Sequence, residues 1–87
     1  MVDIEKLEDL ASLFLTIDEI AVLLDTDAEM LRRQIRHGKN DIALAYQRGK
    51  LKTIVEIRRQ TITFAKKGSP SAENLLNGYM IKQAKNE

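Results

Sequence analysis

Residues that favour helix ends recur along this chain at short intervals, and they restrict its fold more than any other feature. Ser, Thr, Asp and Asn are preferred at helix N-caps, and Pro is tolerated at the first helical position. No stretch shows the strict apolar–polar alternation that is typical of a strand. The sequence therefore predicts an all-α protein whose helices follow four caps, namely Thr16, Thr26 or Asp27, Asn40 or Asp41, and Ser69 before Pro70.

The expected helices cover residues 3–15, 17–24, 27–37, 41–67 and 70–82, and residues 83–87 are expected to fray. Gly38 and Gly68 end the third and fourth of them, because glycine readily adopts the left-handed conformation that closes many helices. Gly49 lies inside the fourth helix and weakens it by roughly 1 kcal/mol relative to alanine. Because glycine is tolerated where another backbone comes close, we expect tight packing or a slight bend there. In the first helix, five apolar side chains share one face, namely Ile4, Leu7, Leu10, Ala11 and Phe14.

Residues 16–37 meet the physical requirements of a helix-turn-helix. Two short helices that cross steeply need a small residue at the crossing, apolar residues that hold the angle, and a permissive turn between them. Ala21 is the small residue, Asp25 lies at the turn, and Thr16 with Glu19 has the spacing of a capping box. The apolar residues that would hold the angle are Ile20, Leu24, Leu31 and Ile35.

The expected architecture is a homeodomain-like three-helix unit, with its helix-turn-helix, in residues 1–40. A long helix and a C-terminal helix would form a hairpin in residues 41–87 and complete one compact domain. The long helix has two apolar seams separated by a basic stripe of Arg48, Lys52, Arg59 and Lys66, and a helix that is apolar on two sides must bury both. The broad seam holds Leu44, Leu51, Ile54, Val55, Ile62 and Ala65, and the second holds Tyr46, Ile57 and Phe64 with Ile42 and Thr53 beside them.

Opposite charges are segregated along the chain, although the net charge is only +1. Residues 1–29 carry nine acidic and one basic side chain, whereas residues 30–67 carry eleven basic and two acidic ones. Such asymmetry is the expected footprint of a surface that binds a polyanion. The alternative is that the two blocks neutralise each other within the fold.

Several classes of protein are excluded by composition. The chain has no cysteine, which rules out disulfides and thiolate zinc sites. It lacks an apolar run of the roughly 20 residues that span a bilayer, and its acidic start is unlike a signal peptide, so we expect a cytoplasmic protein. His37 is the only histidine and lies at a helix end, where it is a favourable charge rather than a base or a metal ligand. We therefore expect no catalysis, no metal and no cofactor.

The run TIDEIAVLLDTDAEMLRRQI, from Thr16, resembles the T-x-x-E-I-A-x-L-L-G-V-S-x-x-T-L-x-R helix-turn-helix of terminase small subunits, the DNA-packaging proteins of phages and prophages. The downstream segments YQRGK and AKKGSPSA are also similar to this family, and the resemblance covers about residues 16–80. Asp25 and Thr26 stand where the family usually has glycine and valine. The resemblance implies a subunit that recognises viral DNA for packaging by a partner ATPase, the large terminase.

In a helix-turn-helix, the exposed side chains of the second helix enter the major groove. Arginine suits this position because it forms paired hydrogen bonds with guanine or with phosphate. The alternative is that Glu29 pairs with Arg33, four residues further on, and the arginines only solvate the surface. The predicted DNA contacts are Ala28, Glu29, Arg32, Arg33 and Arg36 on this helix, with His37, Lys39 and Arg48 as further candidates for phosphate.

The two seams of the long helix leave two interpretations open. One seam could pack on the helix-turn-helix and the other on the last helix, or the hairpin could pack against copies of itself. The resemblance favours an oligomer, because the packaging family assembles rings through its central helices. The side chains expected at contacts between copies are Tyr46, Ile57, Phe64 and Tyr79.

Three functions remain compatible with the sequence. The first is a packaging subunit that binds double-stranded DNA as a homo-oligomer, with no membrane and no small-molecule substrate. The second is a small transcriptional regulator that uses the same motif as a dimer. The third is a protein–protein adaptor in which the helix-turn-helix is only a scaffold.

Overall fold

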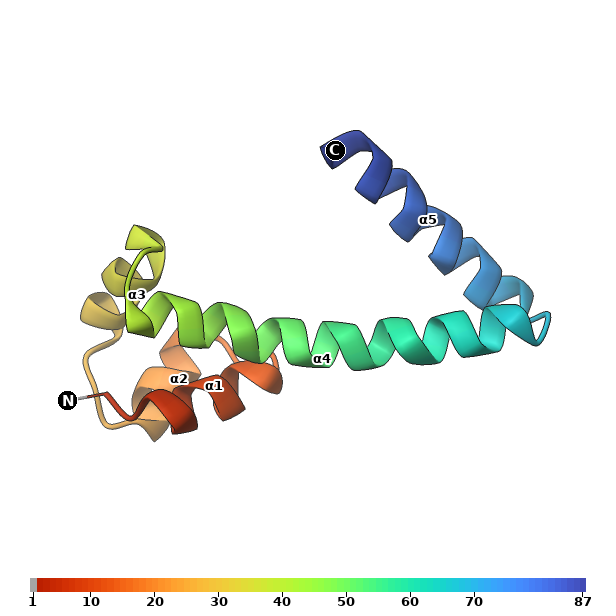
Figure 1. Cartoon of the computed structure of the whole chain (residues 1–87). Coiled ribbons are helices and arrows are strands. Elements are labelled where there is room, and N and C mark those ends of the chain that lie inside the picture. The colour runs from red at the N-terminus through yellow and green to blue at the C-terminus, as the bar shows by residue number, and fades with distance from the viewer. Residues whose placement is uncertain (1) are drawn as a thin grey trace. The chain divides into compact units, whose positions relative to one another are not determined.

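The computed structural model describes residues 2–87 and confirms the all-α prediction (Figure 1). No strand occurs within this range. The five helices, coloured from red to blue in the figure, are α1 (Ile4–Ser12), α2 (Ile17–Leu23), α3 (Ala28–His37), α4 (Asp41–Lys66) and α5 (Pro70–Asn86).

Local hydrogen bonds at the helix starts confirm the predicted caps and decide the two positions that the sequence left open. Thr16 and Glu19 form both bonds of a capping box at α2. Asp27 rather than Thr26 caps α3, because its carboxylate accepts from the Met30 amide at 2.9 Å. At α4 the Asn40 side chain accepts from the Ala43 amide, and Ser69 with Pro70 begins α5.

The structure corrects the predicted ends of two helices. α1 ends at Ser12, and Phe14 has a left-handed φ of 58°, since the amides of Leu13 and Phe14 close the helix on Leu10 and Ala11. Phe14 is half exposed and lies beyond the end of α1, so its assignment to the apolar face of the first helix was wrong. At the other end of the chain, the expected fraying after residue 82 was also wrong, because α5 continues to Asn86.

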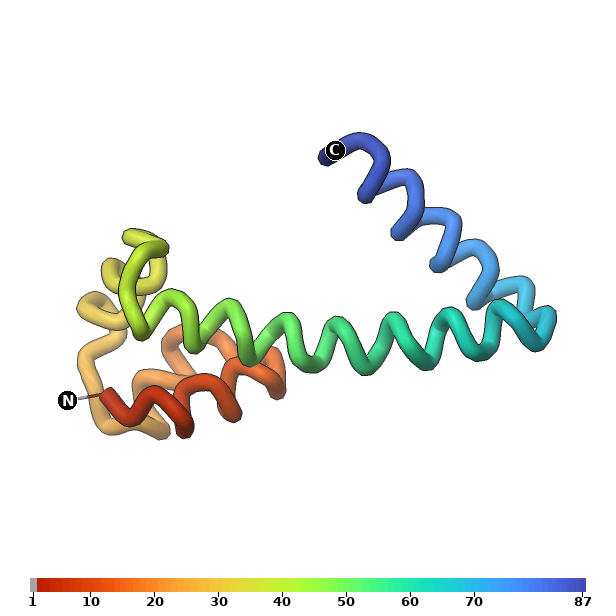
Figure 2. Tube along the Cα trace, viewed as in Figure 1, coloured from red at the N-terminus to blue at the C-terminus, as the bar shows by residue number. Residues whose placement is uncertain are grey.

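The chain divides into two compact units, and the division falls inside α4. Unit 1 extends through Thr53, and unit 2 begins at Ile54. Unit 1 includes the first half of α4 because this half packs on α1 (Figure 2).

Unit 1 holds the main hydrophobic core. Helices α1, α2, α3 and the first half of α4 each contribute to it, and partly buried residues such as Ile35, Ile42 and Tyr46 pack around it. Three large side chains in it, Leu7, Ile20 and Leu31, are fully buried. The remaining buried members of this core are Leu10, Ala11, Ala21 and Ala45.

The contact between α1 and α4 is closest at Gly49. A β-carbon at this position would lie 2.1 Å from the Glu8 carbonyl oxygen and 2.8 Å from the Ala11 β-carbon, which confirms tight packing, the first of the two predicted alternatives. Beside it, the Lys52 ammonium pairs with the Glu8 carboxylate, and the Thr53 hydroxyl donates to the Ser12 carbonyl. The glycine therefore sets the distance at which α4 crosses α1.

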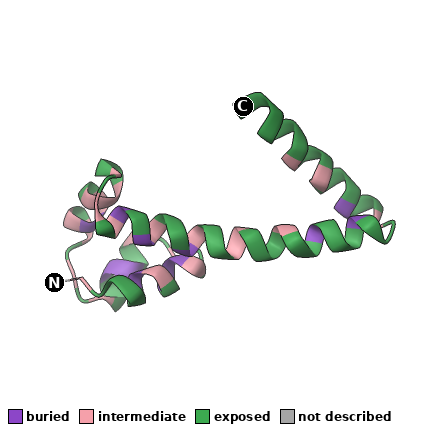
Figure 3. Cartoon of the chain, in the orientation of Figure 1, coloured by how far each residue is buried: buried purple, intermediate pink, exposed green. Residues whose placement is uncertain are grey.

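Unit 2 consists of the second half of α4, the Gly68 turn and α5, and it buries little (Figure 3). Its buried residues are Thr61, Ala65 and Ala72. The Arg58 guanidinium lies 4.5 Å from the centroid of the Tyr79 ring, so a cation–π contact joins the two helices beyond the turn. A pocket of about 270 Å³ lies between them, with Ile62 and Met80 in its lining.

Both apolar seams of α4 were expected to be buried, and the structure differs from this expectation. In unit 1, Ala45 and Gly49 offer the smallest side chains, and the face that they share with Ile42, Tyr46 and Thr53 packs inward. That choice leaves much of the broad seam in solvent, namely Leu44, Leu51, Val55 and Ile62.

Candidate nucleic-acid interface

Helices α2 and α3 meet at a short turn whose geometry depends on small and permissive residues. Ala21 is 2% exposed, and Ile20 and Leu31 are fully buried beside it. Asp25 has a left-handed φ of 51°, and the amide of Thr26 donates to the Ala21 carbonyl at 2.9 Å. Aspartate tolerates this conformation better than most residues, although less well than glycine.

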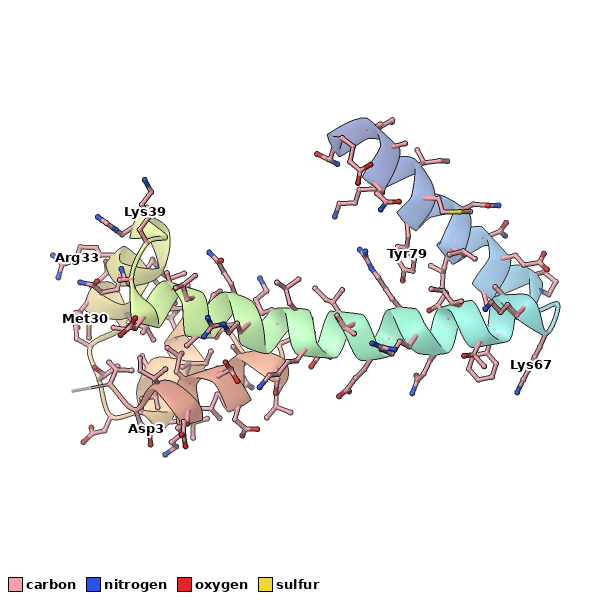
Figure 4. The ribbon with its side chains drawn as sticks, viewed as in Figure 1. Asp3, Met30, Arg33, Lys39, Lys67 and Tyr79 are labelled. Atoms are coloured by element: carbon pink, nitrogen blue, oxygen red, sulfur yellow. The ribbon has the colours of Figure 1, made fainter. Side chains whose placement is uncertain are left out.

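Helix α3 presents a basic surface that no other part of unit 1 covers. Arg33, Arg36 and His37 are exposed on α3, and Lys39 is exposed just beyond the left-handed Gly38 that ends the helix. Figure 4 shows Arg33 and Lys39 pointing outward from this end of the unit. We call these four residues the α3 basic surface. All four were predicted as DNA contacts.

Arg32, the first arginine of the predicted set, is engaged within the fold. Its guanidinium bonds Asp18 of α2 at 2.7 Å and Glu29 of α3 at 2.5 Å. The hydrogen bond with Asp18, together with the charges of both carboxylates, raises the pKa of Arg32 above its ordinary value. Glu29 thus pairs with Arg32, whereas the alternative interpretation had expected it to pair with Arg33. Arg33 is left exposed.

The remaining predicted DNA contacts lie at the margins of this surface. Ala28 is partly buried against the core, and Glu29 is exposed in the first turn of α3. Arg48 is exposed on α4. It lies about 10 Å along the helix axis from Asp41, the first residue of α4, because each residue of a helix adds about 1.5 Å. Arg48 therefore belongs to a different element from the α3 basic surface.

The acidic and basic blocks of the sequence contact each other at few points. Between residues 2 and 87, the ion pairs within 4 Å join only Arg32 with Asp18 and Glu29, and Lys52 with Glu8. None of them uses Arg33, Arg36, Lys39 or Arg48. Internal neutralisation thus accounts for a small part of the basic block, and the α3 basic surface keeps its charge for solvent or for a ligand.

Two polar contacts across unit 1 had no signal in the sequence. Asp18 and Arg32 are fourteen residues apart, and the Lys6 ammonium donates to the Leu23 carbonyl seventeen residues further on. The second contact places a positive charge at the C-terminal end of α2, where the helix dipole favours it. Neither spacing falls within one helical turn, so periodicity could not reveal these pairs.

The residues expected at contacts between copies differ in their availability. Tyr46 packs on the unit 1 core under the Lys50 ammonium, and Tyr79 lies under Arg58. Ile57 and Phe64 are 47% and 54% exposed and have no such cover.

Comparison with protein-family models, with curated proteins and with solved structures finds no match to this chain. Across residues 2–87, no group of three or more His, Cys, Asp or Glu side chains is arranged to hold a metal ion. None of the described helices combines the length and apolarity needed to cross a membrane.

Proposed function

We propose that this protein binds double-stranded DNA with a helix-turn-helix formed by α2 and α3, and that the α3 basic surface contacts the major groove. The observation that carries this proposal is that Arg33 and Arg36 are exposed and free of carboxylate partners on the helix that follows a tight left-handed turn. The buried Ala21 at the helix crossing supports the same arrangement.

The dimensions and chemistry of α3 suit this role. Its ten residues make a helix about 15 Å long, and the major groove is about 12 Å wide. Arg33 and Arg36 can each form two parallel hydrogen bonds with a guanine or with a phosphate. Lys39 carries a single ammonium and suits a phosphate contact, which fixes orientation but carries no sequence information. Arg32 keeps α2 and α3 together through Asp18, so its role is positioning.

The direct test is a titration of the full chain with fluorescently labelled duplex DNA at a low and a higher salt concentration. The affinity should fall steeply as salt rises, because each phosphate contact releases counterions and contributes about −0.9 to the logarithmic slope. Undetectable binding at low salt, or an affinity insensitive to salt, would overturn the proposal.

Single-charge variants then locate the surface. Arg33→Ala and Arg36→Ala should each weaken binding and lower the salt slope by about one unit where the arginine contacts phosphate. Lys85→Ala removes the same charge from the exposed end of α5 and should leave binding nearly unchanged. Equal losses in all three variants would show that net charge, and not this surface, governs binding. Circular dichroism verifies that each variant is folded.

The role that we propose for this DNA binding is recognition of viral DNA for packaging by a partner ATPase. The resemblance of residues 16–80 to terminase small subunits supports it, in particular the segments beyond the helix-turn-helix. A gene for a large ATPase–nuclease beside this one and a ring of about eight or more copies are the expected observations. A dimer without such a neighbour would favour the transcriptional regulator instead.

A further inference from the structure

Both units expose large apolar side chains to a similar extent. The charged residues near these side chains differ in sign between the two units. In unit 2, large apolar residues on both helices are about half exposed, among them Val55, Phe64, Leu75 and Ile81. In unit 1, Val22 of α2 is 78% exposed, more than any other large apolar side chain among residues 2–87. Exposed apolar residues are common singly, but groups of them at helical spacing mark contact surfaces.

The outward side of α2 combines apolar and acidic residues. Asp18, Glu19, Val22 and Leu23 are all exposed. Val22 follows Asp18 by four residues, and Leu23 follows Glu19 by four, so they form two adjacent rows on the side of α2 opposite the buried Ile20 and Ala21. We call this set the α2 outer face. Apart from the contact of Asp18 with Arg32, its side chains make no ion pair in the described chain.

A stripe on the second half of α4 has the complementary composition. Val55, Arg59, Ile62 and Lys66 are spaced by four, three and four residues, and all are exposed. Ile62 also lines the pocket between α4 and α5, whereas Val55, Arg59 and Lys66 lie on a different side of α4 from the residues that face α5, such as Arg58 and Ala65. We call this set the α4 stripe.

We propose that the α4 stripe of one copy docks on the α2 outer face of a second copy. Each surface offers two apolar side chains, and the two bases of one meet the acidic side of the other, where Glu19 has no ion pair and Asp18 also bonds Arg32. Pairing of unit 2 with itself would instead bring together surfaces of the same sign, since residues 54–87 carry six basic and three acidic side chains. Complementary charge thus selects a contact between unlike surfaces.

Such a contact joins two different surfaces, so it is heterologous, and every copy carries both the α4 stripe and the α2 outer face. Copies joined in this way continue head to tail until they close into a ring or extend as a filament. The α3 basic surface takes no part in the contact and stays free in each copy.

The test uses two variants of the full chain that each damage one surface. Val22→Lys places a positive charge in the α2 outer face, and Val55→Lys places one in the α4 stripe. Both sites are exposed, and lysine is at least as good a helix former as valine, so both variants should fold. Gln60→Lys is the matched control, because Gln60 is exposed on another side of α4.

Sedimentation velocity of the unmodified chain and of Gln60→Lys should show the same concentration-dependent assemblies. Val22→Lys and Val55→Lys should each associate about tenfold more weakly or worse, as loss of an anchor residue does at other interfaces. Mixed together, the two variants should form a 1:1 pair and nothing larger, because each retains the surface that the other has lost.

Three outcomes would overturn the proposal. One is an unmodified chain that stays monomeric at all concentrations. Another is a mixture of the two variants that forms no pair, which is the behaviour of a contact between identical surfaces. The third is that Phe64→Lys dissolves the assembly while Val22→Lys leaves it intact, which would place the contact on the Ile57 and Phe64 side of α4.

Discussion

At the scale of single residues, two helical glycines in this chain have opposite surroundings. Gly49 is pressed against the backbone of α1, whereas a β-carbon on Gly78 of α5 would have no neighbour within 4 Å. Alanine generally stabilises a helix relative to glycine, so the sign of its effect at each site depends on space alone.

We therefore predict that Gly49→Ala lowers the free energy of unfolding by roughly 1–3 kcal/mol, because α1 and α4 must move apart to admit the methyl group. Gly78→Ala should raise helix stability by about 0.5–1 kcal/mol. Urea denaturation followed by circular dichroism measures both changes. A stabilising Gly49→Ala would mean that α4 does not approach Glu8 as described.

At the scale of elements, caps and turns decide where each helix begins. Asn40 has two functions at the junction of α3 and α4. Its side-chain oxygen accepts from the Ala43 amide at 2.8 Å, and its side-chain nitrogen donates to the Gln34 carbonyl at 2.9 Å. At the start of α5, the Ser69 hydroxyl lies 3.4 Å from the Ala72 nitrogen, which is a longer and weaker bond.

Asn40→Ala should accordingly cost about 1–2 kcal/mol of stability, near the upper part of the range for N-cap replacements. Ser69→Ala should cost at most about 0.5 kcal/mol. Thermal and urea denaturation of the two variants provide the comparison. Equal losses, or a larger loss at Ser69, would contradict the importance assigned to the α3–α4 junction.

At the scale of the whole molecule, burial is divided unequally between the two units. The fully buried leucines and isoleucine belong to unit 1, and unit 2 buries two alanines and one threonine. Local stability follows buried apolar contact, so the units should open with different free energies.

Hydrogen exchange should show this difference directly. In dilute solution, the amides of α5 should exchange close to the rate of an unfolded chain, while those around Ile20 and Leu31 are strongly protected. When the protein is concentrated, amides along the second half of α4 should become slower as the α4 stripe is covered. Uniform protection of all five helices in dilute solution would contradict the division into units.

Much of the local structure was predictable because it depends on neighbours in the chain. The capping box at Thr16, the left-handed Gly38 and the Ser69–Pro70 start are set by contacts within about four residues, and all are confirmed. The α3 arginines could likewise be proposed as candidates, since their exposure follows from the apolar spacing of one helix.

The sequence by itself determined the helices, their caps and the candidate basic helix, because periodicity and capping are local. Only the tertiary structure decided which arginine is occupied, since Asp18 reaches Arg32 across the α2–α3 turn. It also decided which face of α4 is buried. The two apolar seams of α4 predicted burial on both sides, but the close approach of α1 at Gly49 selects the face with the smallest side chains and leaves larger ones exposed. The packing distance between α1 and α4 determines which face is buried, and the spacing of residues in a sequence does not show this distance.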